Sequence, residues 1–193
     1  MLFNFNNNMS NINNQVNLIN TFRRLWEQHI WWTRSFIIST ICELDDLPSV
    51  TERLLRNPND FAVVLRNFYG IDNAKKFDFL LTEHLLIAES ILNNLKLEKN
   101  EDFYQDKKKW YANADDISIF LANLNPYWPV KQLQTLLYEH LKMIEDIIVL
   151  RMNARFSVEV ARFDSTEAQA LKIADTMSYG IINQLTNRNN TPQ

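Results

Sequence analysis

Apolar residues recur at three- and four-residue spacing along most of this chain, which is the period of an amphipathic helix. In the first such stretch the inward positions include Phe22, Trp26 and His29. Helix-start and turn signals separate the stretches, notably Asn-Pro at 57–58 and Asn-Pro-Tyr-Trp-Pro at 125–129. The pattern predicts long helices over residues 17–43, 72–96, 130–162 and 164–185, and a further one that ends at residue 124.

These helices predict an all-α protein built as an antiparallel four-helix bundle. The long C-terminal helix is expected to pack beside the bundle, and two short helices over 49–69 are expected to form a connection after the first helix. The Asn-rich residues 1–16, where Met9 is an alternative start to Met1, and the polar residues 187–193 are expected to be disordered tails. A single helical domain should therefore occupy residues 17–186.

The composition agrees with this fold class and excludes one group of enzymes. Of the 193 residues, 46% are hydrophobic and only two are glycines, so little of the chain is available for turns. Phosphate-binding loops need several glycines close together, whereas Gly70 and Gly180 lie far apart. A nucleotide-binding fold is therefore not expected.

Charge and hydropathy narrow the possible partners. The formal net charge is −3 and the longest basic run is only Lys107–Lys109, so no nucleic-acid partner is expected. No apolar run is long enough to cross a membrane, and the start of the chain lacks the features of a signal peptide. The lone Cys42 fits a reducing cytoplasm. A small-molecule or protein partner and a homo-oligomer remain open.

Histidine carries the candidate chemistry. The pattern Leu-Leu-x-Glu-His-Leu occurs twice, at residues 80–85 and 136–141, and contains two of the three histidines, His84 and His140. His29, the third, also lies in the middle of an apolar stripe. All three histidines are therefore expected to point into the interior of the protein from separate helices.

Charged and amide side chains accompany the histidines at regular spacing. The residue five positions after each histidine falls at the edge of its stripe, because five residues turn a helix by about 140° beyond a full circle. On the helix that ends at residue 124, Asn113 takes the central place and Asp116 lies at the margin. The residues five positions after the three histidines are Arg34, Glu89 and Glu145.

Imidazoles and carboxylates that converge from several helices are what a divalent metal such as iron, manganese or zinc requires. In this hypothesis the three histidines bind the metal, with Glu89 and Glu145 as ligands or as partners of the ligands. Asn113 and Asp116 would complete or orient the site, and Arg34 would balance its charge. Two alternatives stay open: a buried polar layer that only fixes helix packing, and an enzyme that uses His and Glu as acid–base groups without metal.

The His-x4-acid spacing of His140 and Glu145 on a late helix, with histidines on neighbouring helices, resembles the metal-binding bundles of the hemerythrin-like family. The three-histidine count is similar to that of DinB-like bundles, which hold one divalent ion. These resemblances imply a hemerythrin-like or ferritin-like bundle. Because Ala88 and Asn113 stand where the hemerythrin-like pattern has further ligands, a full di-iron site is not implied.

Other segments are similar to a family of small bacterial all-helical proteins. The similarity covers about residues 25–186, and members of that family are sometimes named acetylglutamate kinase. It implies a self-contained helical fold, whereas the phosphate-binding motifs of amino-acid kinases are absent from this chain. The segments that carry the similarity include Leu-Trp-Glu-Gln-His (25–29), Arg-Leu-Leu-Arg-Asn-Pro (53–58) and Trp-Tyr-Ala-Asn-Ala-Asp (110–115).

Overall fold

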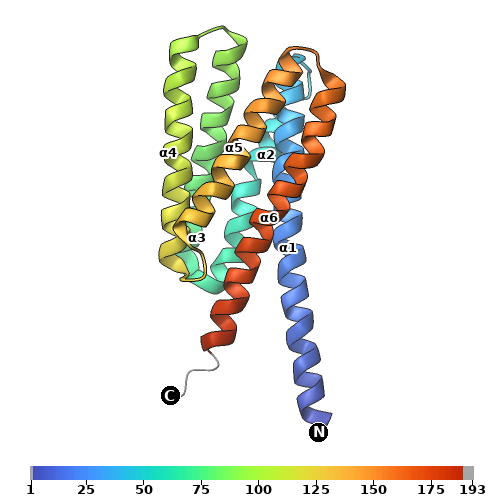
Figure 1. Ribbon diagram of the computed structural model, residues 1–193, viewed down its shortest axis with the longest axis vertical. Helices are drawn as coiled ribbons and strands as arrows, with labels where there is room; N and C mark the ends of the chain where they lie inside the picture. Colours follow the sequence, from blue (N-terminus) through green and yellow to red (C-terminus); the bar gives the residue numbers. More distant parts are fainter. Residues whose placement is uncertain (1, 189–193) are drawn as a thin grey trace.

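The computed structural model describes the backbone of residues 2–188 and the side chains of residues 12–187. Within these residues the chain is all-helical and has no strand, so the predicted fold class is confirmed (Figure 1). The helices are α1 (Leu2–Ile41), α2 (Leu47–Leu55), α3 (Asn57–Lys96), α4 (Asn100–Leu124), α5 (Val130–Met152) and α6 (Phe156–Arg188).

Helix α3 is two helices that fold back on each other at Gly70. Gly70 has φ of 82° and ψ of 174°, a backbone conformation that is not helical and that favours glycine. The rings of Phe61 and Phe77, on either side of Gly70, lie only 5.9 Å apart between centroids. In a straight helix these residues would be separated by about 24 Å, so the chain reverses its direction here.

The helices consequently pair into three hairpins. The first hairpin consists of α1 and residues 57–69 of α3, the second of residues 71–96 of α3 and α4, and the third of α5 and α6. Contacts of α4 with α5 and of α6 with α1 join neighbouring hairpins, as does the Phe61–Phe77 contact within α3. The three hairpins therefore close into a ring around one core (Figure 1).

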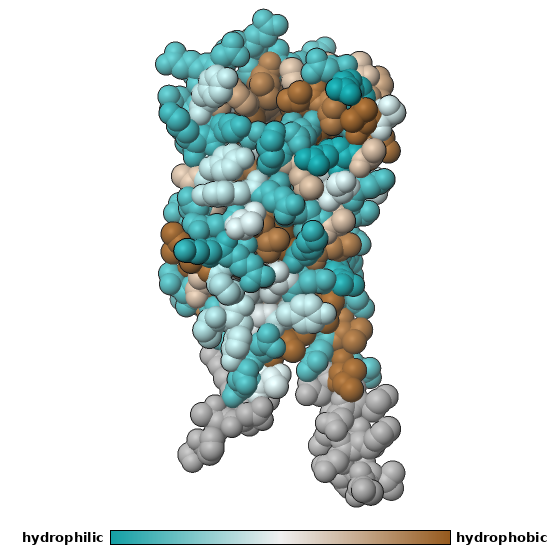
Figure 2. All heavy atoms as spheres, viewed as in Figure 1, coloured by the Kyte–Doolittle hydropathy of each residue, from teal (hydrophilic) through white to brown (hydrophobic). Residues whose placement is uncertain are grey.

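The core consists of the apolar stripes of all these helices. Its largest fully buried side chains include Trp110, Trp128, Phe22, Phe61 and Phe77. The face of the molecule in Figure 2 is mainly hydrophilic, with apolar residues scattered among polar ones. Burial of these stripes, rather than helix propensity alone, holds the helices in place.

Trp128 fixes the turn between α4 and α5 against α6. Its indole Nε1 donates to the backbone oxygens of Thr176 and Met177, at 3.2 Å in each case. The indole lies directly over Gly180, where a Cβ atom would overlap the ring. Glycine at position 180 is therefore required for this close approach.

Two predicted boundaries and the predicted role of one segment need correction. Helix α1 begins at Leu2 rather than near residue 17, although the side chains of residues 1–11 and the tail over 189–193 lie outside the described parts. The predicted helix over 130–162 ends at Met152, because a tight turn with Ala154 at φ of 53° separates α5 from α6. Residues 57–69 are not merely a connection, because Phe61 and Leu65 belong to the core.

Between residues 2 and 188, no helix combines the length and hydropathy required to span a bilayer.

Candidate functional site

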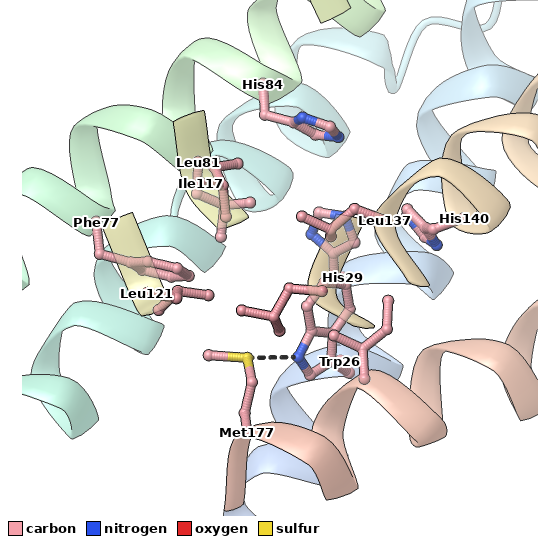
Figure 3. A pocket seen from close by; sticks show the side chains of 12 residues that line it. Trp26, His29, Phe77, Leu81, His84, Ile117, Leu121, Leu137, His140 and Met177 are labelled. Carbon is pink, nitrogen blue, oxygen red and sulfur yellow. Dashed lines mark hydrogen bonds between the residues drawn. The ribbon is translucent and has the colours of Figure 1, made fainter. Parts of the chain in front are cut away.

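Three histidines from three hairpins line one interior cavity. His29 lies on α1, His84 on the second half of α3 and His140 on α5, and their exposed fractions are 2%, 3% and 2%. Each one sits in the middle of an apolar stripe, which is why packing of the helices brings them inside. Figure 3 shows the three side chains at the cavity, with Trp26 and Met177 beside them.

Asn57 anchors the imidazole of His29. The Asn57 amide Nδ2 donates to the backbone oxygen of Leu25 at 3.1 Å, one helical turn before His29. This bond orients the carboxamide, because a carbonyl oxygen accepts only from the amide nitrogen. Asn57 Oδ1 then lies 3.0 Å from His29 Nδ1, which must donate the proton. His29 is thereby held as the Nδ1–H tautomer, with an unprotonated Nε2 on the other side of the ring.

Asn113 anchors His84 in the same manner. Its Nδ2 donates to the backbone oxygen of Leu80 at 3.1 Å, again one turn before the histidine. Its Oδ1 accepts from His84 Nδ1 at 2.9 Å. Nδ2 also contacts the carboxylate of Glu83 at 3.2 Å, which further fixes the orientation of the amide. The His84 ring is therefore in the same tautomer as that of His29.

Gln169 occupies the equivalent place beside His140. Its Nε2 donates to the backbone oxygen of Leu136 at 2.6 Å, one turn before His140. Gln169 Oε1 and His140 Nδ1 are both buried and have no hydrogen-bond partner within the described part of the chain. Gln169 is nevertheless close enough to His140 to raise the pKa of the imidazole, so a small rotation of either group would complete the third imidazole–carboxamide pair.

The three pairs of a histidine and a carboxamide recur at nearly the same spacing in the sequence. The carboxamide and the carbonyl oxygen it binds are separated by 32, 33 and 33 residues in the three hairpins. The histidine–asparagine separations in the first two hairpins are 28 and 29 residues. Each hairpin thus carries a histidine on its first helix and a carboxamide on its second helix. One local arrangement is used three times around the cavity.

Burial keeps all three imidazoles neutral. Loss of water lowers the pKa of His29 from its ordinary 6.5 to about 4, opposed by the hydrogen bond of Asn57. Burial, and then the neighbouring His29, lower the pKa of His84 to about 3. The pKa of His140 lies well below 6.5, through burial and through both other histidines. Neutral imidazole is the form that binds metals.

The cavity at the histidines is small and apolar. Its volume is about 20 Å³, expressed as the room left for the centre of a water-sized sphere. One buried water needs roughly 10–15 Å³ on this measure, so the space suits a single small ion or molecule. Besides the histidines, the lining residues are Trp26, Phe77, Leu81, Ile117, Leu121, Leu133, Leu137, Ile173 and Met177.

The imidazoles are near one another but do not form a closed ligand shell. The ring centroids of His29 and His140 lie 5.6 Å apart. His84 is also close to both of them. The charge of a protonated His29 lowers the pKa of His84, and that of a protonated His84 lowers the pKa of His140. Among the side chains of residues 12–187, no three of His, Cys, Asp or Glu gather as tightly as the ligands of a bound metal would. Metal binding would therefore draw the rings together.

The structure does not bring the predicted carboxylates to the cavity. Glu145 pairs with Lys107 at 2.8 Å, while its other oxygen is buried without a hydrogen bond in the described chain. Glu89 is half-buried on α3, and Asp116 is exposed on α4. None of these residues lines the cavity. Their position at or beyond the edge of each apolar stripe turns them away from the centre.

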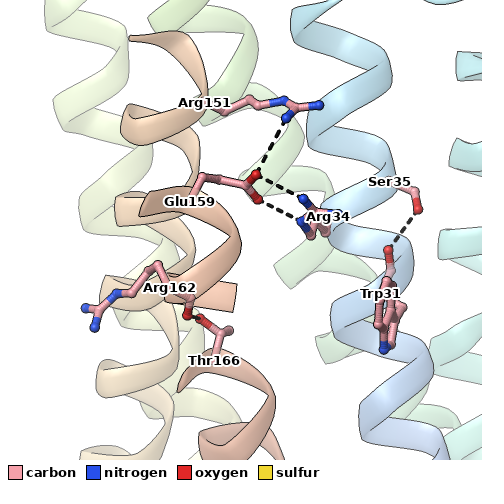
Figure 4. Close-up of polar contacts among 7 residues, drawn as sticks. All are labelled: Trp31, Arg34, Ser35, Arg151, Glu159, Arg162 and Thr166. Atoms are coloured by element: carbon pink, nitrogen blue, oxygen red, sulfur yellow. Dashed lines mark hydrogen bonds and ion pairs between the residues drawn. The ribbon is translucent and has the colours of Figure 1, made fainter. Parts of the chain in front are cut away.

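Arg34 belongs to a separate buried ion cluster (Figure 4). Its Nε and Nη2 donate to the two oxygens of Glu159 at 2.7 and 2.9 Å. Arg151 approaches the same carboxylate at 3.5 Å. Glu159 is completely buried, so its charge is compensated by the two arginines rather than by water. Arg34 thus balances the charge of Glu159 and does not line the histidine cavity.

Two residues of the candidate site, Asn57 and Gln169, were not recognised in the sequence. Asn57 precedes a proline and has the form of a helix-start residue, and Gln169 is one of several polar residues in the first half of α6. A signal was nevertheless present, because the spacing from His84 to Asn113 recurs, within one residue, from His29 to Asn57 and from His140 to Gln169. A search for that recurring spacing would have identified both.

Comparison with known proteins provides no relative from which to assign this site. Neither family models, nor curated proteins, nor solved structures yield a significant match to the chain. The function must therefore be argued from the residues at the cavity.

Proposed function

We propose that this protein binds one metal ion through His29, His84 and His140. The observation that carries the proposal is the carboxamide beside each imidazole, set in the same register in all three hairpins. Histidines that bind metals commonly donate their second N–H to an oxygen that fixes tautomer and ring orientation. Asn57 and Asn113 perform this role for two of the histidines, and Gln169 is placed to perform it for the third.

The free ring nitrogens also support a ligand at the cavity. Nε2 of His29 and of His84 makes no hydrogen bond within the described residues, and both rings line the cavity. A metal ion in the cavity would give these two nitrogens a partner. At His140 the buried ring nitrogen without a hydrogen bond is Nδ1, the atom from which Gln169 would accept.

Among the divalent ions expected from the sequence, zinc and iron suit this site better than manganese. Imidazole is a good ligand for zinc and iron, whereas manganese prefers the oxygen ligands that lie outside the cavity. The small cavity favours one ion, as in DinB-like bundles, over the two irons of hemerythrin-like ones. The scaffold of this proposal is the predicted antiparallel four-helix bundle with its long C-terminal helix, extended by residues 57–69. A cytoplasmic location, expected from the single Cys42, belongs to the same proposal.

Metal content measured by elemental mass spectrometry after equilibrium dialysis tests the proposal. We expect about one equivalent of metal per chain, and loss of that metal in His84→Ala. Leu81→Ala is the matched control, because it also truncates a buried side chain at the cavity but removes no ligand. Circular dichroism would establish that both variants are folded. Failure of the unmodified protein to bind any metal, or equal binding by His84→Ala, would leave the histidines as a packing layer.

A further inference from the structure

The histidine cavity contains no negative charge to compensate a metal ion. Its lining is three neutral imidazoles and nine apolar residues. Outside this lining, Glu145 is paired with Lys107, and Glu159 is paired with Arg34 and Arg151. The charge of an ion bound at the histidines would therefore stay largely uncompensated in a medium of low polarity.

The charge of the ion then decides how well it can be buried. The free energy needed to move an ion from water into a medium of low dielectric constant rises with the square of its charge. A doubly charged ion with three neutral ligands thus carries about four times the penalty of a singly charged ion of equal size. Divalent sites in proteins usually reduce this penalty with carboxylate ligands, and this cavity has none.

The space at the cavity also limits the number of ligands. Zinc is generally four-coordinate, so at a three-histidine site it needs a fourth ligand such as water. The volume of about 20 Å³ has room for a single small sphere, which the ion itself would fill. An ion whose preferred coordination number is two or three fits this space better than an ion that prefers four or more ligands.

The distance between two of the rings is compatible with a shared ion. The centroids of His29 and His140 lie 5.6 Å apart. With metal–nitrogen bonds of about 2.0 Å, two imidazoles on one ion have centroids roughly 5–6 Å apart, so these two rings need to move only a little on binding. Singly charged copper commonly takes two or three ligands.

We infer that the ion held by His29, His84 and His140 is copper(I), in a two- or three-coordinate site buried among apolar side chains. This inference rests on the proposed three-histidine site and specifies the charge and coordination of its ion. Imidazole is a suitable ligand for copper, and the absence of carboxylates from the lining removes the advantage of divalent ions. The same apolar surroundings would favour copper(I) over copper(II), because oxidation would add a buried charge.

Competition between metals under anaerobic conditions tests the inference. The metal-free protein, in its Cys42→Ser form to remove the exposed thiol, would be titrated with copper(I) buffered by a bathocuproine chelator, and separately with buffered zinc and iron(II). We expect one copper(I) per chain and an affinity at least about 100-fold above that for zinc, since one additional buried charge corresponds to several powers of ten. X-ray absorption should show two or three nitrogen ligands and no sulfur.

A charge introduced at the cavity provides the second measurement. Leu81→Glu places a carboxylate in the lining and should shift the preference toward zinc, whereas Leu81→Gln, of similar size but neutral, should not. If zinc or iron(II) binds at one equivalent through the histidines and more tightly than copper(I), the copper inference is overturned while the proposed function stands. If no metal binds, both are overturned. The titration of the Cys42→Ser protein decides between these outcomes even if the Leu81 variants do not fold.

Discussion

At the scale of single residues, His29 and His84 are each held by a carboxamide from the next helix of the hairpin, and His140 has a carboxamide beside it. Asn113 is the best defined of these, with bonds to His84 Nδ1 and to the backbone oxygen of Leu80. It satisfies two buried polar groups and at the same time fixes the tautomer of the imidazole. Its contribution to stability and its contribution to metal binding can therefore be measured separately.

Asn113→Ala should weaken metal binding by roughly 10–100-fold, because His84 loses the partner that orients it. The same change should lower the free energy of unfolding by about 1–3 kcal/mol, because the freed groups remain buried. Metal affinity by competition and stability by urea unfolding measure the two effects. Ser118→Ala, on the same buried face of α4, is the control that should leave the affinity unchanged. Equal loss of affinity in both variants would show that Asn113 acts only through stability.

Glu159 is the second residue whose environment yields a quantitative expectation. It is completely buried between Arg34 and Arg151, so Glu159→Gln leaves two partly buried guanidinium groups without their carboxylate. We expect a loss of about 3–5 kcal/mol in urea unfolding. Asp175→Asn is the control, because its pair with Arg23 is largely exposed and should contribute less than about 1 kcal/mol. Similar losses in both variants would mean that burial does not strengthen the Glu159 cluster.

At the scale of elements, the contact of α6 with the α4–α5 turn depends on one glycine. Gly180→Ala would place a methyl group inside the Trp128 indole, so the ring must move and lose its bonds to Thr176 and Met177. We expect a loss of about 1–3 kcal/mol, typical of overpacking, despite the better helix propensity of alanine. Thermal unfolding followed by Trp fluorescence measures it. Tyr179→Ala, at an exposed neighbouring position, should change the stability little.

The elements themselves were largely predictable, because their apolar stripes have the helical period over many turns. The positions where one helix ends and the next begins were not. The turn between α5 and α6 uses Asn153 and Ala154, neither of which is a strong break signal, whereas Asp164 to Glu167 has the pattern of a helix start inside α6. Gly70, by contrast, predicted the end of a helix, but a chain reversal there could be recognised only from the contact of Phe61 with Phe77.

The candidate site was predictable only in part, for a related reason. Periodicity placed His29, His84 and His140 inside, because a stripe position requires only the residue's own helix. It could not place Glu89, Glu145 or Arg34, because an edge position faces whichever helix packs next to it. Pairing with Lys107 and with Glu159 was determined by the packing of whole hairpins. The role of the carboxamides likewise became visible only when neighbouring helices were brought together.

At the scale of the whole molecule, three buried neutral histidines make stability dependent on pH. Their pKa values are about 4 for His29, about 3 for His84 and well below 6.5 for His140, whereas in the unfolded chain each is near 6.5. Below pH 6.5 the unfolded state therefore takes up protons that the folded state does not. The histidine contribution is fully present above pH 6.5 and is lost as the pH falls through about 4 for His29 and about 3 for His84.

The loss should reach up to about 4 kcal/mol per pH unit near pH 5, because each histidine contributes up to about 1.4 kcal/mol per unit. Urea unfolding of the metal-free protein between pH 7 and 4.5 measures this slope. In His84→Gln the slope should decrease by roughly a third, since one proton no longer takes part. A stability that does not change between pH 7 and 5 would contradict neutral burial of the three imidazoles.

The division of the ring into three hairpins has a consequence for how the protein is made. Each hairpin brings its own imidazole and carboxamide, and the pair of His140 and Gln169 is the last of the three to be synthesised. A nascent chain that ends before residue 140 lacks the third imidazole, and one that ends before residue 169 lacks its carboxamide. An ion held by all three imidazoles would therefore mark a molecule in which the three hairpins have closed together.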